Sequence, residues 1–133
     1  LINTASKSLD FSDGTTQFVL QAKRCFTFYV ESPTSTNSEW IGQVRFDDPF
    51  TITSIQAVAS KGASGWNLMY GPAGSQTTKV FTDYKAASAS TYPTYTTFAN
   101  STILNNNVLS YVVASNSADQ QSNAATVCGR YNK

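Results

Sequence analysis

Residues 39–70 read EWIGQVRFDDPFTITSIQAVASKGASGWNLMY, and this stretch decides the fold class. Residues 40–46 alternate between two faces until Pro49, which fixes φ and ends the strand. Residues 50–59 are rich in β-branched side chains, which suit a pleated sheet. After a glycine loop, residues 66–70 alternate again. The stretch predicts three successive antiparallel strands, a β-meander, and an all-β protein.

Short strands separated by turn signals recur along the rest of the chain. The cleanest is CFTFYVE at residues 25–31, with phenylalanines and valine on one face and Thr27, Tyr29 and Glu31 on the other. Further strands are expected at residues 17–21, 77–84, 91–98, 109–114 and 125–131. Residues 85–90, KAASAS, resemble a small-residue linker, with one helical turn as the alternative. This spacing predicts an antiparallel β-sandwich or jelly roll of about eight short strands.

A chain of 133 residues suits a single domain. Residues 1–9 carry only sparse apolar anchors, so we expect a mobile amino-terminal arm unless a partner holds it. The chain starts at Leu1 rather than Met, which suggests a processed mature form or an excised segment. No apolar run approaches the ~20 residues that a membrane-spanning helix needs.

The composition is polar but weakly charged. Charged residues make up 13%, the net charge is +1, and Ser, Thr, Asn and Gln together exceed a third of the chain. The basic residues are scattered, so nothing indicates nucleic-acid binding. Such surfaces are common in secreted β proteins and coat subunits, and we expect an extracellular location.

Two cysteines are present, Cys25 and Cys128. An even count in a chain of extracellular character favours a disulfide, which would close a loop of about 100 residues. It would make the strands that carry these cysteines neighbours. The alternative is two buried, unpaired thiols.

Catalytic groups are scarce. The chain has no histidine, which removes Ser-His-Asp and Cys-His nucleophile systems. Asp47 and Asp48 are adjacent and would face opposite ways on a strand. We therefore expect no enzymatic activity and no cofactor. Calcium at Asp10 with Asp13, or at Asp47 with Asp48, is a less favoured alternative to ordinary acidic turns, so no metal site is predicted.

Aromatic rings near amides and hydroxyls are candidates for sugar binding, because a flat ring stacks on the C–H face of a sugar. Trp40 is expected in the core. Trp66 follows a glycine loop, with core and exposed rim equally open, and Asn67 is adjacent. Tyr92 and Tyr95 lie in a threonine-rich segment without obvious apolar partners. The predicted ligand-binding residues are Trp66, Asn67, Tyr92 and Tyr95.

Residues 39–81 resemble the discoidin (coagulation factor 5/8 type C) family in their order of strands and loops. The matching pieces are EWIGQVRFDDPF, TITSIQAVA, SKGASGW and NLMYGPAGSQTTKVF, followed later by LSYVVAS. A cysteine near each end is similar to the disulfide that joins the termini in that family. The resemblance implies a jelly-roll sandwich that binds glycans, lipids or proteins through loops at one end.

Two functions from different classes follow. The first is a non-catalytic extracellular module that binds carbohydrate or another cell-surface ligand. The second is a structural subunit of a coat or filament that self-associates through β-strand pairing. The first, with carbohydrate as the ligand, is the function we expect. The second is the alternative, and three features support it: the weakly charged surface, the lack of catalytic groups, and an amino-terminal arm that could pair with a neighbour's sheet edge.

Overall fold

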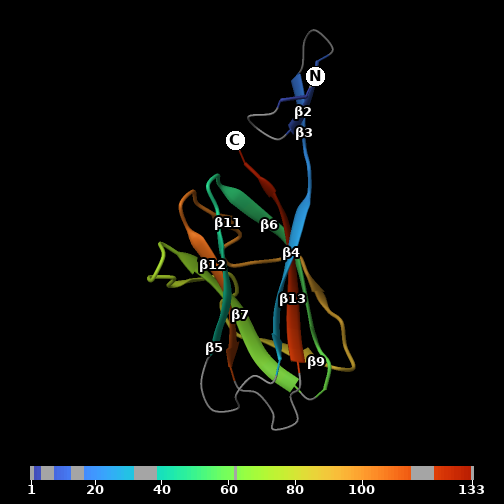
Figure 1. Cartoon of the computed structure of the whole chain (residues 1–133). Helices are drawn as coiled ribbons and strands as arrows, with labels where there is room; N and C mark the ends of the chain where they lie inside the picture. The colour runs from blue at the N-terminus through green and yellow to red at the C-terminus, as the bar shows by residue number, and fades with distance from the viewer. Residues whose placement is uncertain are drawn as a thin grey trace.

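The computed structural model describes residues 2–3, 8–12, 17–31, 39–61, 63–114 and 122–132. Within these ranges, side chains are described for residues 22–31, 42–61, 64–114 and 122–132. Every regular element in the described part is a β-strand (Figure 1). It holds no helix of the length and apolarity that a bilayer crossing requires.

Two five-stranded antiparallel sheets form the body, and each is named here after its long edge strand. The β4 sheet contains β4 (Arg24–Glu31), β13 (Ser122–Tyr131), β6 (Phe50–Ala59), β10 (Thr94–Tyr95) and β11 (Thr102–Ile103). The β5 sheet contains β5 (Glu39–Arg45), β12 (Val108–Ala114), β7 (Ala63–Gly71), β8 (Thr78–Lys79) and β9 (Lys85–Ser88). The predicted antiparallel β-sandwich is confirmed.

The chain alternates between the two sheets as it advances. β4 and β6 belong to one sheet, whereas β5 and β7 belong to the other, with β12 between them. The predicted meander is therefore wrong, because β5, β6 and β7 do not pair with one another. Each connection crosses the sandwich instead, which places distant segments side by side as in a jelly roll.

A third, smaller sheet lies beyond one end of the sandwich (Figure 1). It contains β1 (Ile2–Asn3), β2 (Ser8–Ser12) and β3 (Gln17–Gln21), paired antiparallel in that order. The residues between β3 and β4 are only Ala22 and Lys23, and the trace passes straight from one strand to the other. We call this element the arm sheet. The mobility of residues 1–9 stays a prediction.

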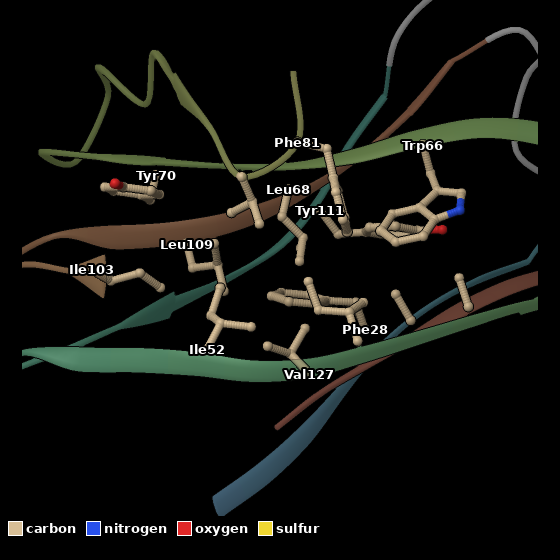
Figure 2. Packing of buried hydrophobic residues seen from close by; sticks show 14 of the residues in the cluster. Phe28, Ile52, Trp66, Leu68, Tyr70, Phe81, Ile103, Leu109, Tyr111 and Val127 are labelled. Carbon is tan, nitrogen blue, oxygen red and sulfur yellow. The ribbon is translucent and has the colours of Figure 1, made fainter. Parts of the chain in front are cut away.

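The core lies between the two body sheets (Figure 2). β6 shows why: Phe50, Ile52, Ile55, Ala57 and Ala59 point inward and are at most 2% exposed. Aromatic rings fill the middle, where Phe28 of β4 stacks on Tyr111 of β12 with ring centroids 5.9 Å apart. The two sheets are thus joined mainly by apolar packing.

Three strand predictions need correction. Residues 85–88 form β9 rather than a linker, since small side chains let the strand lie against β7, and Ala87 is fully buried. Within residues 77–84 and 91–98, only the two-residue strands β8 and β10 form. The side chain of Trp40 lies outside the described side chains, so its placement in the core stays a prediction.

Candidate assembly surface

Trp66 faces the core instead of a sugar-binding rim. It is 0% exposed, and its ring meets Phe81 at 5.5 Å and Tyr111 at 5.8 Å between centroids (Figure 2). The alternation of β7 places Trp66, Leu68 and Tyr70 on one face, and that face is the inner one. Of the two placements left open for Trp66, the structure shows the core.

Asn67 is also buried, although strand alternation directs it away from the core. Its Nδ2 donates to the Phe81 carbonyl oxygen at 2.9 Å, and its Oδ1 accepts from the Phe81 N–H at 3.2 Å. The segment after β8 thus covers Asn67, and both ends of the amide are occupied. The polar atoms of Asn67 thus hold a neighbouring segment in place, and its role in ligand binding stays a prediction.

The two tyrosines differ from each other. Tyr92 is 62% exposed, whereas Tyr95 is half-buried and its ring lies 5.8 Å from that of Trp66. Burial raises the pKa of the Tyr95 hydroxyl. Tyr92 is thus the single member of the predicted set with an exposed ring. None of the four residues lines the open hollow of about 330 Å³ that is bounded by Gln43, Gly74, Ser75, Gln76 and Thr77.

A buried polar chain that the sequence did not reveal connects the two sheets. Tyr111 of β12 donates its hydroxyl hydrogen to Asn123 Oδ1 on β13, and Asn123 Nδ2 donates to Ser64 Oγ on β7. All three side chains are buried, and desolvation raises the pKa of Tyr111 far above its usual value. The chain is a structural link rather than a reactive site, because no solvent reaches it.

The most unusual surface is the free edge of β4. β4 pairs with β13 through eight successive residues without a register shift, from Glu31↔Ser122 to Arg24↔Gly129. No strand of the described residues pairs with its other side. A long, regular edge is a template for another strand, because it presents a row of unpaired N–H and C=O groups.

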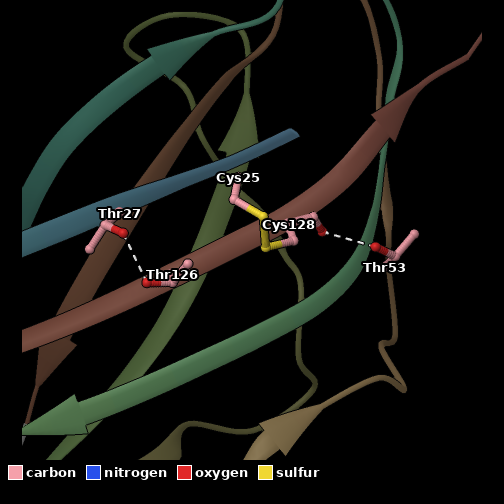
Figure 3. The surroundings of a disulfide bond; sticks show 5 residues. All are labelled: Cys25, Thr27, Thr53, Thr126 and Cys128. Carbon is pink, nitrogen blue, oxygen red and sulfur yellow. Dashed lines mark hydrogen bonds between the residues drawn. A yellow bond between two sulfur atoms is a disulfide. The ribbon is translucent and has the colours of Figure 1, made fainter. Parts of the chain in front are cut away.

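The disulfide identifies which backbone groups are free. Cys25 and Cys128 are bonded directly across β4 and β13, as predicted, with a Cα–Cα distance of 4.1 Å (Figure 3). Such a short separation belongs to a non-hydrogen-bonded antiparallel pair, in which both residues direct their N–H and C=O groups away from each other. Pairs alternate, so the same holds for Thr27, Tyr29 and Glu31. These four residues direct their backbone groups to the open edge.

Their side chains occupy the outer face of the β4 sheet. Thr27 Oγ1 lies 2.8 Å from Thr126 Oγ1 on β13, next to the disulfide (Figure 3). Tyr29 is 57% exposed, and its hydroxyl donates to Glu31 Oε1 at 3.1 Å. The inner-face residues Phe26 and Val30 are only partly buried. The outer face at this edge is thus polar, while on the inner face Phe26 and Val30 leave some apolar surface exposed.

The other described edges of the body are blocked by shortness or distortion. β8, β10 and β11 have two residues each, and β9 has four. β5 is longer, but its pairing with β12 shifts between Ser110 and Tyr111, opposite Gly42, whose φ is +61°. Such bulges and short strands are the usual protection against edge pairing. β4 lacks both.

No metal-binding arrangement is found in the described part of the chain. No group of three His, Cys, Asp or Glu side chains lies close enough there to hold a metal ion. Asp47 is 88% exposed and forms an ion pair with Arg45 at 3.5 Å. Asp10 lies in β2, and the side chains of Asp10 and Asp13 lie outside the described ones, so calcium there is untested.

Comparison with known proteins yields one distant structural likeness to report. No protein-family model matches the sequence, and no curated protein matches it at a significant level. A chain from "Structure of infectious bursal disease virus Gx strain" matches 92% of this chain, with 10% identity and a TM-score of 0.38. The match spans 37% of the viral chain. A likeness at this level establishes neither a common fold nor a common function.

Proposed function

We propose that this chain is a non-catalytic structural subunit of an extracellular coat or filament that assembles by β-strand pairing. The observation that carries the proposal is the edge of β4. This edge is long and regular, and no described strand pairs with it. It also runs directly into the arm sheet, which lies outside the sandwich (Figure 1). Strand pairing at such an edge supplies main-chain hydrogen bonds to a neighbouring subunit.

Surface composition and the disulfide support the same role. With 13% charged residues and a net charge of +1, copies of the chain repel one another only weakly. The Cys25–Cys128 disulfide would persist in an oxidising environment, which fits an extracellular location. The jelly-roll arrangement alone does not distinguish a coat subunit from a carbohydrate-binding module, because both coat proteins and lectins use it.

Carbohydrate binding is the second candidate, and the exposed ring of Tyr92 is the observation that favours it. The resemblance to discoidin domains, which remains untested, points in the same direction. Against this candidate, Trp66 and Asn67 are buried and cannot meet a sugar at the surface. A site centred on Tyr92 would hold one flat ring and the surrounding hydroxyls, including Thr91 and Ser88, whose side-chain oxygens lie 2.8 Å apart.

The two candidates are separated by measuring assembly and glycan binding on the same protein. Light scattering and electron microscopy across a wide concentration range should show dimers and larger regular assemblies. A chain that stays monomeric throughout would contradict the structural role. A glycan-array signal that is lost in Tyr92→Ala, with an unchanged melting temperature, would instead establish the second candidate.

A further inference from the structure

We propose that the free edge of β4 pairs antiparallel with β4 of a second copy of this chain. In this pairing Lys23 lies opposite Glu31 of the other copy, and Thr27 lies opposite Thr27 on a two-fold axis. The inference rests on the proposed assembly by strand pairing and adds the partner, the edge and the register. The argument comes from backbone parity, charge and the apolar surface at this edge.

Parity limits the registers that are allowed. Cys25, Thr27, Tyr29 and Glu31 direct their N–H and C=O groups to the open edge, so hydrogen bonds form only where odd-numbered residues face odd-numbered residues. An antiparallel pair centred on Thr27 satisfies this rule. It places Cys25 opposite Tyr29, and it places Lys23, the residue just before β4, opposite Glu31.

Charge selects one register from those that parity allows. The described side chains form a single ion pair, Arg45–Asp47, so Lys23 and Glu31 have no oppositely charged partner there. Both are exposed. The Tyr29 hydroxyl bonds to Glu31 Oε1, which leaves the other carboxylate oxygen for an incoming ammonium group. Sliding the pair by two residues in either direction would place Glu31 opposite Cys25 or Gln21 and lose both ion pairs.

The inner face agrees with this register. Phe26 of one copy would lie opposite Phe28 of the other, and Phe26 is only partly buried in the single chain. Cross-strand aromatic pairs stabilise antiparallel sheets. Arg24 would lie opposite Val30, which puts no like charges together. The two β4 sheets would then form one continuous sheet across a closed two-fold interface.

Such a pair places the arm sheets at opposite ends. The two-fold axis reverses the direction of β4, and each arm sheet continues from the amino-terminal end of its own β4. A pair of subunits therefore carries its two arm sheets at opposite ends of the paired strands.

A charge swap tests the register. We expect Lys23→Glu and Glu31→Lys each to raise the dimer dissociation constant about tenfold or more, because each creates two like-charge pairs at the interface. The double variant should restore the dissociation constant to within about threefold of the wild-type value, since it only reverses the pairs. Lys61→Glu, an exposed change on the loop after β6, is the matched control and should leave it unchanged. Sedimentation equilibrium measures all four variants against the wild type.

A proline variant tests the edge itself. Thr27 directs its N–H away from β13, so Thr27→Pro should keep the β4–β13 ladder and block pairing by a second strand. Loss of the dimer with retained circular dichroism is the expected result. If this variant fails to fold, the charge swap decides alone. Wild-type assembly that survives every β4 variant would overturn this inference and leave the structural role standing. A wild-type chain that is monomeric at all concentrations would contradict both.

Discussion

β4 and β5 are consecutive long edge strands of the same sandwich, one in each sheet, yet they are built differently. β5 is interrupted by a shift in register opposite a glycine in the left-handed region. β4 is regular over eight pairs and is tied to its neighbour by a disulfide. The difference shows that this chain distorts one exposed edge and keeps the other straight. A straight edge risks aggregation, so its retention is best explained by a partner strand.

The largest loss of stability should come from removing the disulfide that joins β4 to β13. Replacing both cysteines by serine (Cys25→Ser with Cys128→Ser) should lower the free energy of unfolding by about 2–5 kcal/mol, because the unfolded chain regains the freedom of a loop of about 100 residues. Urea denaturation of the variant and of reduced wild-type protein should give similar losses. A loss below about 1 kcal/mol would show that pairing with β13 alone holds β4 in place.

A side chain at the bulge of β5 should have the next largest effect on stability. Gly42→Val places a branched side chain at φ +61° and a Cβ atom 3.0 Å from Phe28 Cδ1. We expect a loss of about 2–3 kcal/mol in the free energy of unfolding from the backbone strain and the contact together. Gly74→Ala is the control: φ is +80° but no atom lies within 4 Å of the new Cβ. It should cost only about 1–2 kcal/mol, and equal losses would contradict the contact with β4.

Alkaline pH should weaken the buried hydrogen-bond chain of Tyr111, Asn123 and Ser64. Tyr111 lies on β12, next to β5, and Asn123 lies on β13, next to β4. Burial raises the pKa of Tyr111 in the folded chain above its ordinary value of 10.0, so above pH 10 the unfolded chain ionises first. Stability should be full below that pH and fall by up to about 1.4 kcal/mol per pH unit above it. Tyr70 and Tyr95 shift in the same direction and add to the slope.

The variant Tyr111→Phe measures how much Tyr111 contributes to this loss of stability at alkaline pH. This variant should show a shallower decline above pH 10 in melting curves, together with a lower stability at neutral pH, because Asn123 Oδ1 loses its donor. An unchanged alkaline slope would assign the effect to other tyrosines.

The smallest effect should come from the side chains on the outer face of β4. Thr27→Ala removes the contact with Thr126 Oγ1 and should cost less than about 1 kcal/mol. Self-association should survive, because the free edge offers backbone groups rather than the hydroxyl. A double-mutant cycle with Thr126→Ala measures the pair, and sedimentation measures the assembly. Loss of association in Thr27→Ala would mean that the outer face, and not the edge, makes the contact.

Local patterns in the sequence predicted much of this fold. The two faces of β4 and the bounds of β6 follow from alternation and β-branched content, and the cysteine count led to the disulfide. These features depend on near neighbours or on simple chemistry. The sheet to which each strand belongs does not, and this is why β5, β6 and β7 were assigned to a meander.

The predicted site failed for a related reason. Strand alternation says that Trp66 and Asn67 lie on opposite faces of β7, but not which face meets the other sheet. It also cannot show that the segment at Phe81 returns to cover Asn67. The candidate edge was equally invisible, because whether β4 has one neighbour or two depends on strands about 100 residues away.

The position of the disulfide also has a mechanical consequence. Cys25 follows the arm sheet directly, and Cys128 lies three residues before Tyr131, the last residue of β13. Tension between the arm and the carboxyl end would therefore pass through one covalent bond between adjacent strands. The intervening part of the chain, including nearly all of the core, would carry almost none of that load. A subunit pulled by its neighbours in this way would keep its sandwich folded while the arm bears the force.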